Sequence, residues 1–531
     1  MSAGGWVRAG ALAAGVAAAL IAGPGVASAD DGTDRGDERS SARTATARPA
    51  GPARGERAAQ PRRAVRPAAG RPAASHRRPP GAATESVDAP VPARAARPAA
   101  PAATRPPGPV RSAVLAAQAY IYGFPLMEYQ RVRQTVATLN TLYSLTSFAN
   151  PDVDPVWKAI GDRKRPNVDT FYSLAELDLS RGPVVLSIPD MGSRYFSFQL
   201  TDPYTNVSGY IGSRTTGSGP GSYAITWAGG QQADIPGAQT VLVPYSSMMM
   251  LGRTLAGDEP DQQSAIELMK QYTLDPTGGT VDPVVPIPRP GIRYLDSISA
   301  AMELNPPPAV DEARVESMAR IGVGPGLRVA DADLGLVSMV AVDLATRAAA
   351  ALLPLLTAVN QYTAALLHRG WATPNPAIGD YGTDYLLRAG VAEVGLLANT
   401  PEEAVYSAGL LSRNLLALRG GAVLPYVLHF GPGEEPPVDA FWSVTVYDAA
   451  GRLVPNAENR HSVSSSRPAE LARRPDGSVD IVFSPRDPGD PGANWLKVPW
   501  IGRFSAYLRM YSPGQPVLDG AWTAPPITRR P

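Results

Sequence analysis

The stretch RPNVDTFYSLAELDLSRGPVVLSIPD (165–190), with its continuation RYFSFQLTDPYTNVSGYIG (194–212), decides the fold class. Its apolar residues fall in short alternating runs, and Gly, Pro and Asp bound each run. Runs of this kind predict strands of an antiparallel sandwich or barrel. The same pattern continues in YAITW (223–227) and TVLVP (240–244). We therefore expect an N-terminal β domain within residues 112–260.

Strand signals return near the end of the chain. FWSVTVYD (441–448) and GRLVP (451–455) are joined by a short turn, which favours a hairpin. VDIVF (479–483) follows the turn residues Asp-Gly, and FSAYLRMY (504–511) closes the series. These runs predict a C-terminal β domain, to which we assign residues 421–531.

Between the two β regions, residues 261–420 have mostly helical patterns. The uncharged run 348–367 is long enough to suggest a membrane span, but Pro354 and several polar residues interrupt it. A buried core helix is the better interpretation of that run. The order is strands, helices, strands, without a βαβ rhythm, which indicates an α+β, mainly β, protein. We expect helices at 262–272, 311–321, 333–367 and 401–416, and one more that starts at Ser112.

The N-terminus has the features of a secretory signal peptide over residues 1–29. Arg8 precedes the apolar run 11–22, and the small residues Ala27 and Ala29 fit the recognition pockets of signal peptidase. The run is shorter than the roughly 20 residues that a membrane span needs. We therefore predict export, cleavage after Ala29 and no transmembrane anchor in the mature chain.

Residues 30–111 contain 16 Arg, 8 acidic residues and no aromatic residue. Such a segment cannot bury enough apolar surface to offset its conformational entropy, so we expect a disordered linker. It is either a cationic tether through an anionic cell wall or a plain spacer, and its composition fits both.

Charge and composition exclude several function classes. The whole chain carries +1. Because residues 30–111 carry +8 and Arg8 adds one, residues 112–531 carry −8, which argues against a nucleic-acid partner. The chain has no Cys and only four His, which excludes thiolate chemistry and leaves little for a metal site. We predict no metal and no cofactor. Abundant Arg, Ala, Gly and Pro is typical of high-GC actinobacterial genomes.

Two blocks of motifs support a family resemblance. The first joins AYIYGFPL (119–126) to the strand-rich stretch 165–217, and the second joins AFWSVTVYDAAGRLVPNAENRHSV (440–463) to NWLKVP (494–499). Together they resemble bacterial exported proteins that pair domain of unknown function 1254 with domain of unknown function 1214. The resemblance implies two jelly-roll-like antiparallel β domains with a helical segment between them. It implies no activity.

Polar residues at the strand ends of the first block are candidates for a site. Asp169 and Tyr172 lie where a strand begins, and Asp202 and Asn206 follow another strand that has Arg194 at its other end. Asp169 and Asp202 could work together in general acid–base chemistry on a sugar. Alternatively, Asp and Asn at strand ends cap turns through hydrogen bonds to the backbone.

The second block adds a loop rich in amide and basic groups. Asn459, Arg460 and His461 follow one another, and His461 is a candidate titrating group because a neighbouring cation would lower its pKa. Trp442 in the preceding strand is more typical of a core residue. For a polar ligand bound by loops at strand ends, the predicted residues are Asp169, Tyr172, Arg194, Asp202, Asn206, Asn459 and Arg460.

The sequence contains none of the common catalytic signatures, such as G-x-S-x-G, H-E-x-x-H or a Walker loop. We therefore expect a secreted or cell-wall-associated module that binds a wall polymer or a small polar ligand, or that has a structural role. The alternative is a carboxylate-dependent hydrolase acting on a sugar or another polar substrate. The oligomeric state stays open.

Overall fold

The computed structural model describes residues 106–135, 138–148, 165–230, 234–281, 283–421, 424–457 and 460–530. The predicted signal peptide, the predicted linker as far as residue 105, and Asn459 lie outside these ranges. Everything below concerns the described residues, which all belong to one unit by their contacts.

The N-terminal β domain consists of two sheets that enclose an apolar core. One sheet has the strand order β1-β2-β8-β4-β5 and the other has the order β7-β6-β3-β9. All neighbours are antiparallel except the β6–β7 pair, which is parallel. The strands are β1 (Tyr143–Ser144), β2 (Thr170–Asp178), β3 (Val184–Ile188), β4 (Phe196–Thr201), β5 (Val207–Gly212), β6 (Gly221–Trp227), β7 (Gln239–Val243), β8 (Ser247–Leu255) and β9 (Thr273–Pro276).

The C-terminal β domain repeats this arrangement, with a five-stranded sheet β10-β11-β17-β13-β14 and a four-stranded sheet β16-β15-β12-β18. Here the β15–β16 pair is the parallel exception. The strands are β10 (Trp371–Ala372), β11 (Ala404–Gly409), β12 (Tyr426–Phe430), β13 (Val438–Asp448), β14 (Ser462–Ser464), β15 (Val479–Ser484), β16 (Ala493–Lys497), β17 (Phe504–Pro513) and β18 (Thr528–Arg529).

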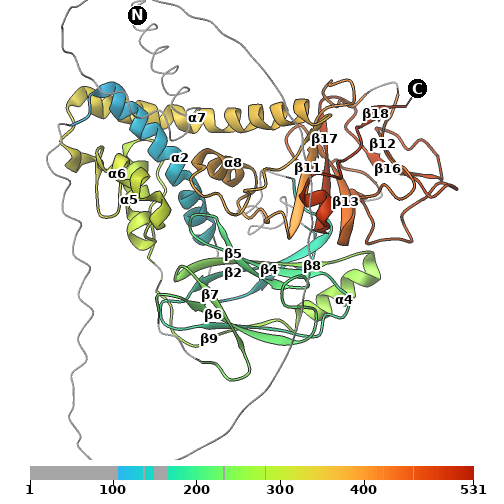
Figure 1. Cartoon of the computed structure of the whole chain (residues 1–531), viewed down its shortest axis with the longest axis horizontal. Coiled ribbons are helices and arrows are strands. Elements are labelled where there is room, and N and C mark those ends of the chain that lie inside the picture. Colours follow the sequence, from blue (N-terminus) through green and yellow to red (C-terminus); the bar gives the residue numbers. More distant parts are fainter. Residues whose placement is uncertain are drawn as a thin grey trace, which may run out of the picture. The chain divides into compact units, whose positions relative to one another are not determined.

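A layer of helices adjoins the N-terminal β domain (Figure 1), and one apolar cluster joins the two. Its close packing explains the glycine of the motif AYIYGFPL, because a Cβ at Gly123 would clash with the side chain of Ile298. The helices of this layer are α2 (Pro109–Arg133), α5 (Ile292–Leu304), α6 (Glu312–Ala319), α7 (Leu336–Leu367) and α8 (Tyr385–Gly395). Other helices are α4 (Glu259–Met269), α9 (Gln515–Leu518) and the 3₁₀ turns η1 (Ala309–Asp311) and η2 (Val329–Ala332).

The predicted α+β, mainly β, fold with two jelly-roll-like domains is confirmed, and several local predictions need correction. The predicted helix at 401–416 is wrong, because Ala404–Gly409 forms β11 in the C-terminal sheet. The first helix begins at Pro109, since Gly108 is its N-cap and Ser112 lies inside it. The assigned boundaries also shift: β9 follows residue 260, and β10 and β11 precede residue 421.

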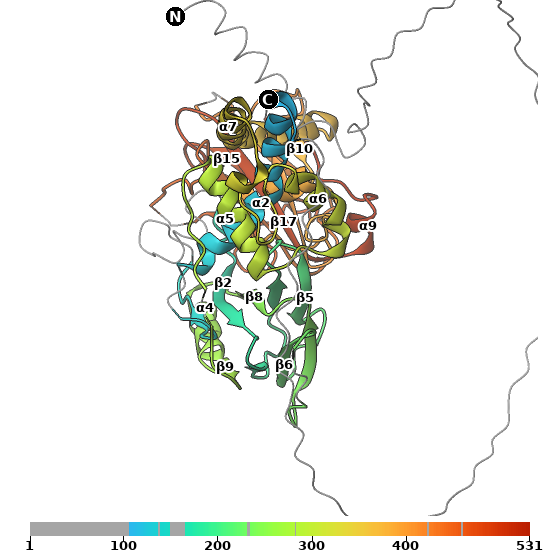
Figure 2. The ribbon, with the colours of Figure 1, turned by 90° about the vertical axis from the view of Figure 1, so that its left-hand side faces the viewer.

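The long helix α7 differs from the expected buried core helix in one respect. Ala341, Ala345 and Ala349 are buried against the helical layer, but Leu344 and Leu355 are 52% and 58% exposed. Among the described residues, α7 is the one helix long and apolar enough to cross a membrane by length and composition. Figure 2 shows it at the edge of the helical layer.

Candidate functional site

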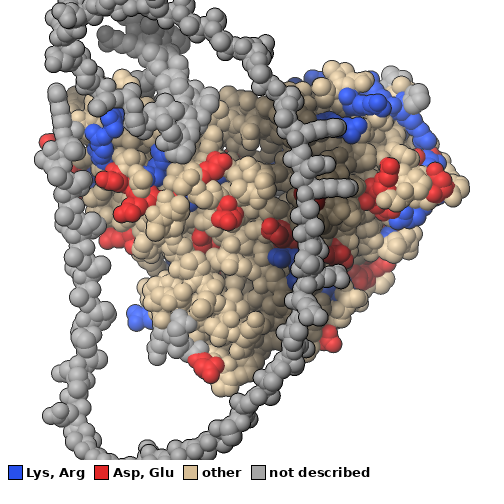
Figure 3. All heavy atoms as spheres, viewed as in Figure 1, with Lys and Arg blue, Asp and Glu red and all other residues tan. Residues whose placement is uncertain are grey.

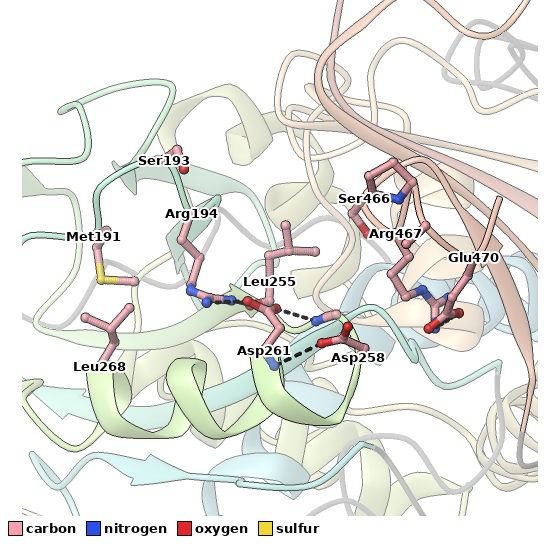
Figure 4. Close-up of a pocket in the computed structure, with 13 residues that line it drawn as sticks. Met191, Ser193, Arg194, Leu255, Asp258, Asp261, Leu268, Ser466, Arg467 and Glu470 are labelled. Carbon is pink, nitrogen blue, oxygen red and sulfur yellow. Dashed lines mark hydrogen bonds and ion pairs between the residues drawn. The ribbon is translucent and has the colours of Figure 1, made fainter.

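A cleft of about 430 Å³ lies where the two β domains meet. One wall consists of the segment before β4, the end of β8 and the start of α4, and the other wall consists of residues 466–470 after β14. Figure 4 shows the labelled side chains, with Arg194 and Asp261 on one side and Arg467 and Glu470 on the other. The cleft therefore draws on both β domains.

The wall from the N-terminal domain is held by an ion pair. The two terminal nitrogens of Arg194 donate to Asp261 Oδ1 and Oδ2 at 2.6 and 2.9 Å, and one of them also donates to the carbonyl of Leu255 at 2.7 Å. Burial alone would raise the pKa of Asp261, but hydrogen bonds from Arg194 and from the backbone N–H of Gly257 outweigh it and lower this pKa. The Nε of Arg194 is buried without a hydrogen-bond partner among the described residues.

The start of α4 completes this wall. Asp258 is the N-cap of the helix and accepts a hydrogen bond from the backbone N–H of Asp261 at 3.0 Å. A carboxylate at this position satisfies a helix N–H that has no partner within the helix. The local sequence therefore places two carboxylates at the rim of the cleft. Asp261 is paired with Arg194, and Asp258 is exposed to solvent.

The opposite wall carries Arg467 and Glu470. Arg467 donates to the hydroxyl and carbonyl of Ser462, and its other terminal nitrogen lies 3.8 Å from a Glu470 carboxylate oxygen. The Glu470 side chain is 45% exposed, so it is available to a ligand. The predicted residue Arg460 lies behind this wall, where it donates to the carbonyl of Glu470 at 3.4 Å. It supports the wall and does not line the cleft.

A second group of polar residues closes the junction between the β domains. The predicted residue Asp169 is 2% exposed and accepts hydrogen bonds from the hydroxyls of Ser443 and Ser462, both in the C-terminal domain. Next to it, Asn167 donates to the Tyr511 hydroxyl at 2.6 Å. Asp169 therefore joins the two domains through side-chain hydrogen bonds.

The same closed layer contains a buried arginine. Arg509 donates to the Thr445 hydroxyl at 3.0 Å, to the Tyr447 hydroxyl at 2.7 Å and to the Arg165 carbonyl at 3.0 Å. Burial raises the pKa of Tyr447 to about 12, so it stays protonated at neutral pH and donates to the carbonyl of Pro166 at 2.6 Å. These contacts bind the sheet of the C-terminal domain to the segment that leads into β2.

The layer continues with a buried carboxylate, Glu403, which sequence reasoning missed. It accepts hydrogen bonds from the Tyr195 hydroxyl at 2.6 Å and from Arg214 Nε at 2.8 Å. Farther in, Arg253 donates to Gln199 at 2.8 Å, and its guanidinium lies 5.9 Å from the ring centre of the predicted residue Tyr172. Tyr172 is thus an interior residue of the junction.

The predicted residues Asp202 and Asn206 form a turn. Asp202 accepts hydrogen bonds from the backbone N–H groups of Tyr204 and Asn206 and from the Asn206 side chain at 2.8–3.1 Å. Burial raises the pKa of Asp202 to about 6, although the hydrogen bonds from Asn206 act in the opposite direction. This is the turn-capping role that was the alternative to a site.

The structure does not bring Asp169 and Asp202 together. Asp169 lies beside Ala256 at one end of β8, and Thr201 pairs with Met249 near the other end. At about 3.3 Å per residue the two carboxylates are more than 20 Å apart, whereas glycosidase pairs lie about 5–10 Å apart. Arg194 is the predicted residue that lines the cleft.

The histidines show no sign of a metal site within the described residues, where no group of three or more metal-binding side chains occurs. His429 lies in β12 and pairs with Asp480 at 2.7 Å. The pKa of His461 is lowered, as predicted, but the cause is burial and not the neighbouring Arg460.

Sequence reasoning missed most of the cleft. Asp258 and Asp261 form a recognisable helix start before α4, but nothing local shows that Asp261 pairs with Arg194, 67 residues away. Arg467 and Glu470 lie in a Ser- and Pro-containing stretch without a strand pattern, so no signal separated them from ordinary loop residues.

The fold and its junction define a class of protein with two jelly-roll-like β domains, a helical layer and a cleft where the β domains meet. Residues 140–276 match the family described as "Protein of unknown function (DUF1254)", and residues 403–515 match "Protein of unknown function (DUF1214)". The predicted resemblance to these two domains, in this order, is confirmed.

One solved structure supports the fold, and a second is similar only at a low level. A Vibrio parahaemolyticus protein of known crystal structure is 23% identical, with a TM-score of 0.59 over 79% of this chain and 100% of its own. An uncharacterised Burkholderia cenocepacia protein is 14% identical, with a TM-score of 0.37 over 76% of this chain and 91% of its own. No curated protein matches the chain.

Proposed function

We propose that this protein is exported to the cell envelope or beyond and binds a small polar ligand in the cleft between its two β domains. The observation that carries the proposal is the cleft itself, which has about 430 Å³ of space and is lined by both domains. Pockets for small molecules have volumes of about 300–1,000 Å³ and often lie between domains.

The lining favours a ligand with hydroxyl groups and a charge, such as a sugar acid or an amino acid. Asp258 and Glu470 offer carboxylates, Arg467 offers a guanidinium, and Ser193 and Ser466 offer hydroxyls. Leu255, Leu268, Met191 and Pro468 supply apolar surface between these groups. A few placed polar groups on an apolar lining fix the orientation of a ligand.

The hydrogen bonding of Asp169 and Asp202 and the pKa of Asp261 favour ligand binding over hydrolysis. Asp169 and Asp202 are each hydrogen-bonded inside the fold, at opposite ends of β8. Asp261 has a lowered pKa, so it is ionised at neutral pH and is a poor general acid. The charged walls of the cleft are therefore better suited to binding a polar ligand than to hydrolysing one.

Export is supported by the N-terminal sequence alone. Arg8, the apolar run 11–22 and the small residues before Asp30 have the order of a signal peptide. Protein recovered from the culture medium or the envelope should begin at Asp30. An intact Met1 or Ser2 terminus in that fraction would contradict export by this route.

The cleft is tested with a thermal-shift screen of sugars, sugar acids and amino acids on the full chain. We expect at least one class to raise the melting temperature, and Ser193→Trp to abolish the rise because its side chain fills the cleft. Ser264→Trp is the matched control, since Ser264 is an exposed residue of α4 outside the cleft. If Ser193→Trp responds to the ligand as the unmodified chain does, the site is elsewhere.

A further inference from the structure

Three loops of the C-terminal β domain meet at one end of that domain. The backbone N–H of Gly420 donates to the carbonyl of Gly502 at 2.9 Å, and the guanidinium of Arg486 lies 4.8 Å from the ring centre of Trp500. These contacts join the loops into one surface, which we call the loop patch. The loops are residues 411–421 after β11, residues 485–489 after β15 and residues 499–503 between β16 and β17.

The loop patch exposes large apolar side chains. Trp500 and Ile501 are 52% and 90% exposed, and on the neighbouring loop Leu415 and Leu416 are 46% and 64% exposed. Single exposed apolar residues are common on soluble domains and need no explanation. Four large ones on adjoining loops are a concentration of the kind that marks an interaction site.

A tight turn holds Leu415 at the tip of its loop. The Ser412 N–H donates to the Leu416 carbonyl at 2.8 Å, and the Leu415 N–H donates to the Ser412 carbonyl at 2.8 Å. Leu415 has a φ of 59°, in the left-handed region that glycine and asparagine adopt far more easily than leucine. Folding alone would favour glycine here, so a contact made outside the chain is the better explanation of this leucine.

The exposed charges of the loop patch are mostly basic. Asp487 is the one exposed acidic residue of the three loops, against four exposed arginines. In Figure 3, Lys and Arg gather on the C-terminal domain around β12 and β18. The loop patch adjoins that region, because the N–H of residue 413 donates to the Ile527 carbonyl just before β18. The exposed basic residues are Arg413, Arg419, Arg486 and Arg503.

The carboxylates next to the loop patch have basic partners of their own. Asp448, where β13 ends beside β17, pairs with Arg452 at 3.2 Å. Asp490, directly after the second loop, pairs with Arg474 at 2.6 Å and with Arg530 at 3.2 Å. Residues 112–531 as a whole carry −8. The loop patch is therefore a local basic surface on an acidic body.

We propose that the loop patch docks on an anionic phospholipid surface, with its apolar side chains among the lipids and its arginines beside the phosphates. Apolar insertion and basic charge are the two signals that together hold a protein on anionic lipid, and Trp favours the membrane–water interface. A lipid layer adapts to separate loop tips, whereas a protein partner needs a complementary shape. The inference is independent of the cleft, because no residue of the loop patch lines it.

The absence of cysteine from the chain allows a direct test. Ile501→Cys in the full chain is labelled with an environment-sensitive dye and mixed with phosphatidylglycerol or phosphatidylcholine vesicles. We expect a blue shift and a roughly twofold rise in emission with phosphatidylglycerol, because the dye leaves water, and a much weaker response with phosphatidylcholine. Gln263→Cys on exposed α4 is the matched control and should show no change.

Further substitutions in the chain labelled at position 501 test the apolar and the basic part separately. Leu416→Ser should raise the phosphatidylglycerol concentration at half response by roughly fivefold. Leu242→Ser on β7 is its control, since Leu242 is 56% exposed and lies on the other β domain. The double variant Arg419→Gln, Arg503→Gln should reduce the preference for phosphatidylglycerol over phosphatidylcholine by roughly tenfold. All these side chains are exposed, so the melting temperature should stay unchanged.

Three results would overturn the proposal. The first is an unchanged spectrum at position 501 with phosphatidylglycerol vesicles, and the second is an equal response to phosphatidylcholine. The third is a blue shift that depends on protein concentration without vesicles, which would assign the loop patch to a second copy of the chain.

Discussion

The junction between the two β domains has a closed part and an open part, and the same kinds of side chain serve different purposes in them. In the closed part Asp169 and Arg509 are 2% and 5% exposed, and both have partners in the other domain or in the segment leading to it. In the open part Glu470 is 45% exposed and its nearest charged partner is 3.8 Å away.

This difference in exposure separates the charged residues that stabilise the fold from those that can bind a ligand. A buried charge needs its partners, because an unpaired charge in the interior costs several kcal/mol. An exposed charge is already solvated, so it can exchange water for a ligand at little cost to the fold. Charged residues at the same junction therefore have different roles, and the exposed fraction of the side chain separates them.

The largest loss of stability is expected for a substitution in the closed part of the junction. Asp169→Ala should lower the free energy of unfolding by about 4 kcal/mol, because it leaves two serine hydroxyls and nearby Arg509 without their carboxylate. Urea denaturation of the full chain measures it. A loss below about 1 kcal/mol would mean that Asp169 does not hold the two domains together.

Asp202 sharpens the comparison, because it is equally buried but has all its partners within one turn. Its pKa is about 6 in the folded state and about 3.9 in the unfolded state. The folded state therefore holds the proton more tightly, and stability from this group falls by roughly 2 kcal/mol as the pH rises from 4 to 7.

Asp202→Asn removes that titration while keeping the shape of the side chain. We expect the difference in unfolding free energy between the variant and the unmodified chain to change by roughly 2 kcal/mol between pH 4 and pH 7, in favour of the variant at pH 7. A difference that does not vary with pH would show that the carboxylate titrates normally.

A smaller loss of stability is expected for a substitution in the wall of the cleft. Arg194→Ala removes an ion pair whose carboxylate is 37% exposed, so the loss should be about 1.5 kcal/mol. Because Arg194 lowers the pKa of Asp261, its contribution is present at neutral pH and is lost as the pH falls below about 4. Denaturation at pH 7 and pH 3 measures both.

The smallest effect on stability is expected for Glu470→Ala, within about 0.5 kcal/mol, with a clear loss of affinity for a cleft ligand. Glu267→Ala is its control, since Glu267 is an exposed carboxylate on α4 outside the cleft. If Glu470→Ala destabilises the fold as much as Asp169→Ala, the division between the closed and open parts is not valid.

The strands could be predicted where one face meets the core and the other does not, as in β3 with its alternating burial. β8 was missed because both of its faces are buried: Met248 and Met250 pack in the β sandwich, and Met249 and Leu251 pack on the helices. Its sequence therefore reads as an apolar run without alternation.

Site prediction was limited by distance along the chain. Asp169 and Arg194 were recognisable as polar groups at strand ends, but the serines that bind Asp169 lie 274 and 293 residues farther on. Local sequence shows which groups can form hydrogen bonds, but only the tertiary structure shows whether their partners are protein atoms or water.

The position of β11 has a consequence for dividing the chain. β11 pairs with β17 along Ala404–Gly409, although it precedes the rest of the C-terminal domain and is reached from the helical layer. A fragment that starts at residue 421 would leave the apolar edge of β17 unpaired, and such an edge is a template for aggregation. The C-terminal domain is therefore separable only together with residues from 371 onward, which carry β10 and β11.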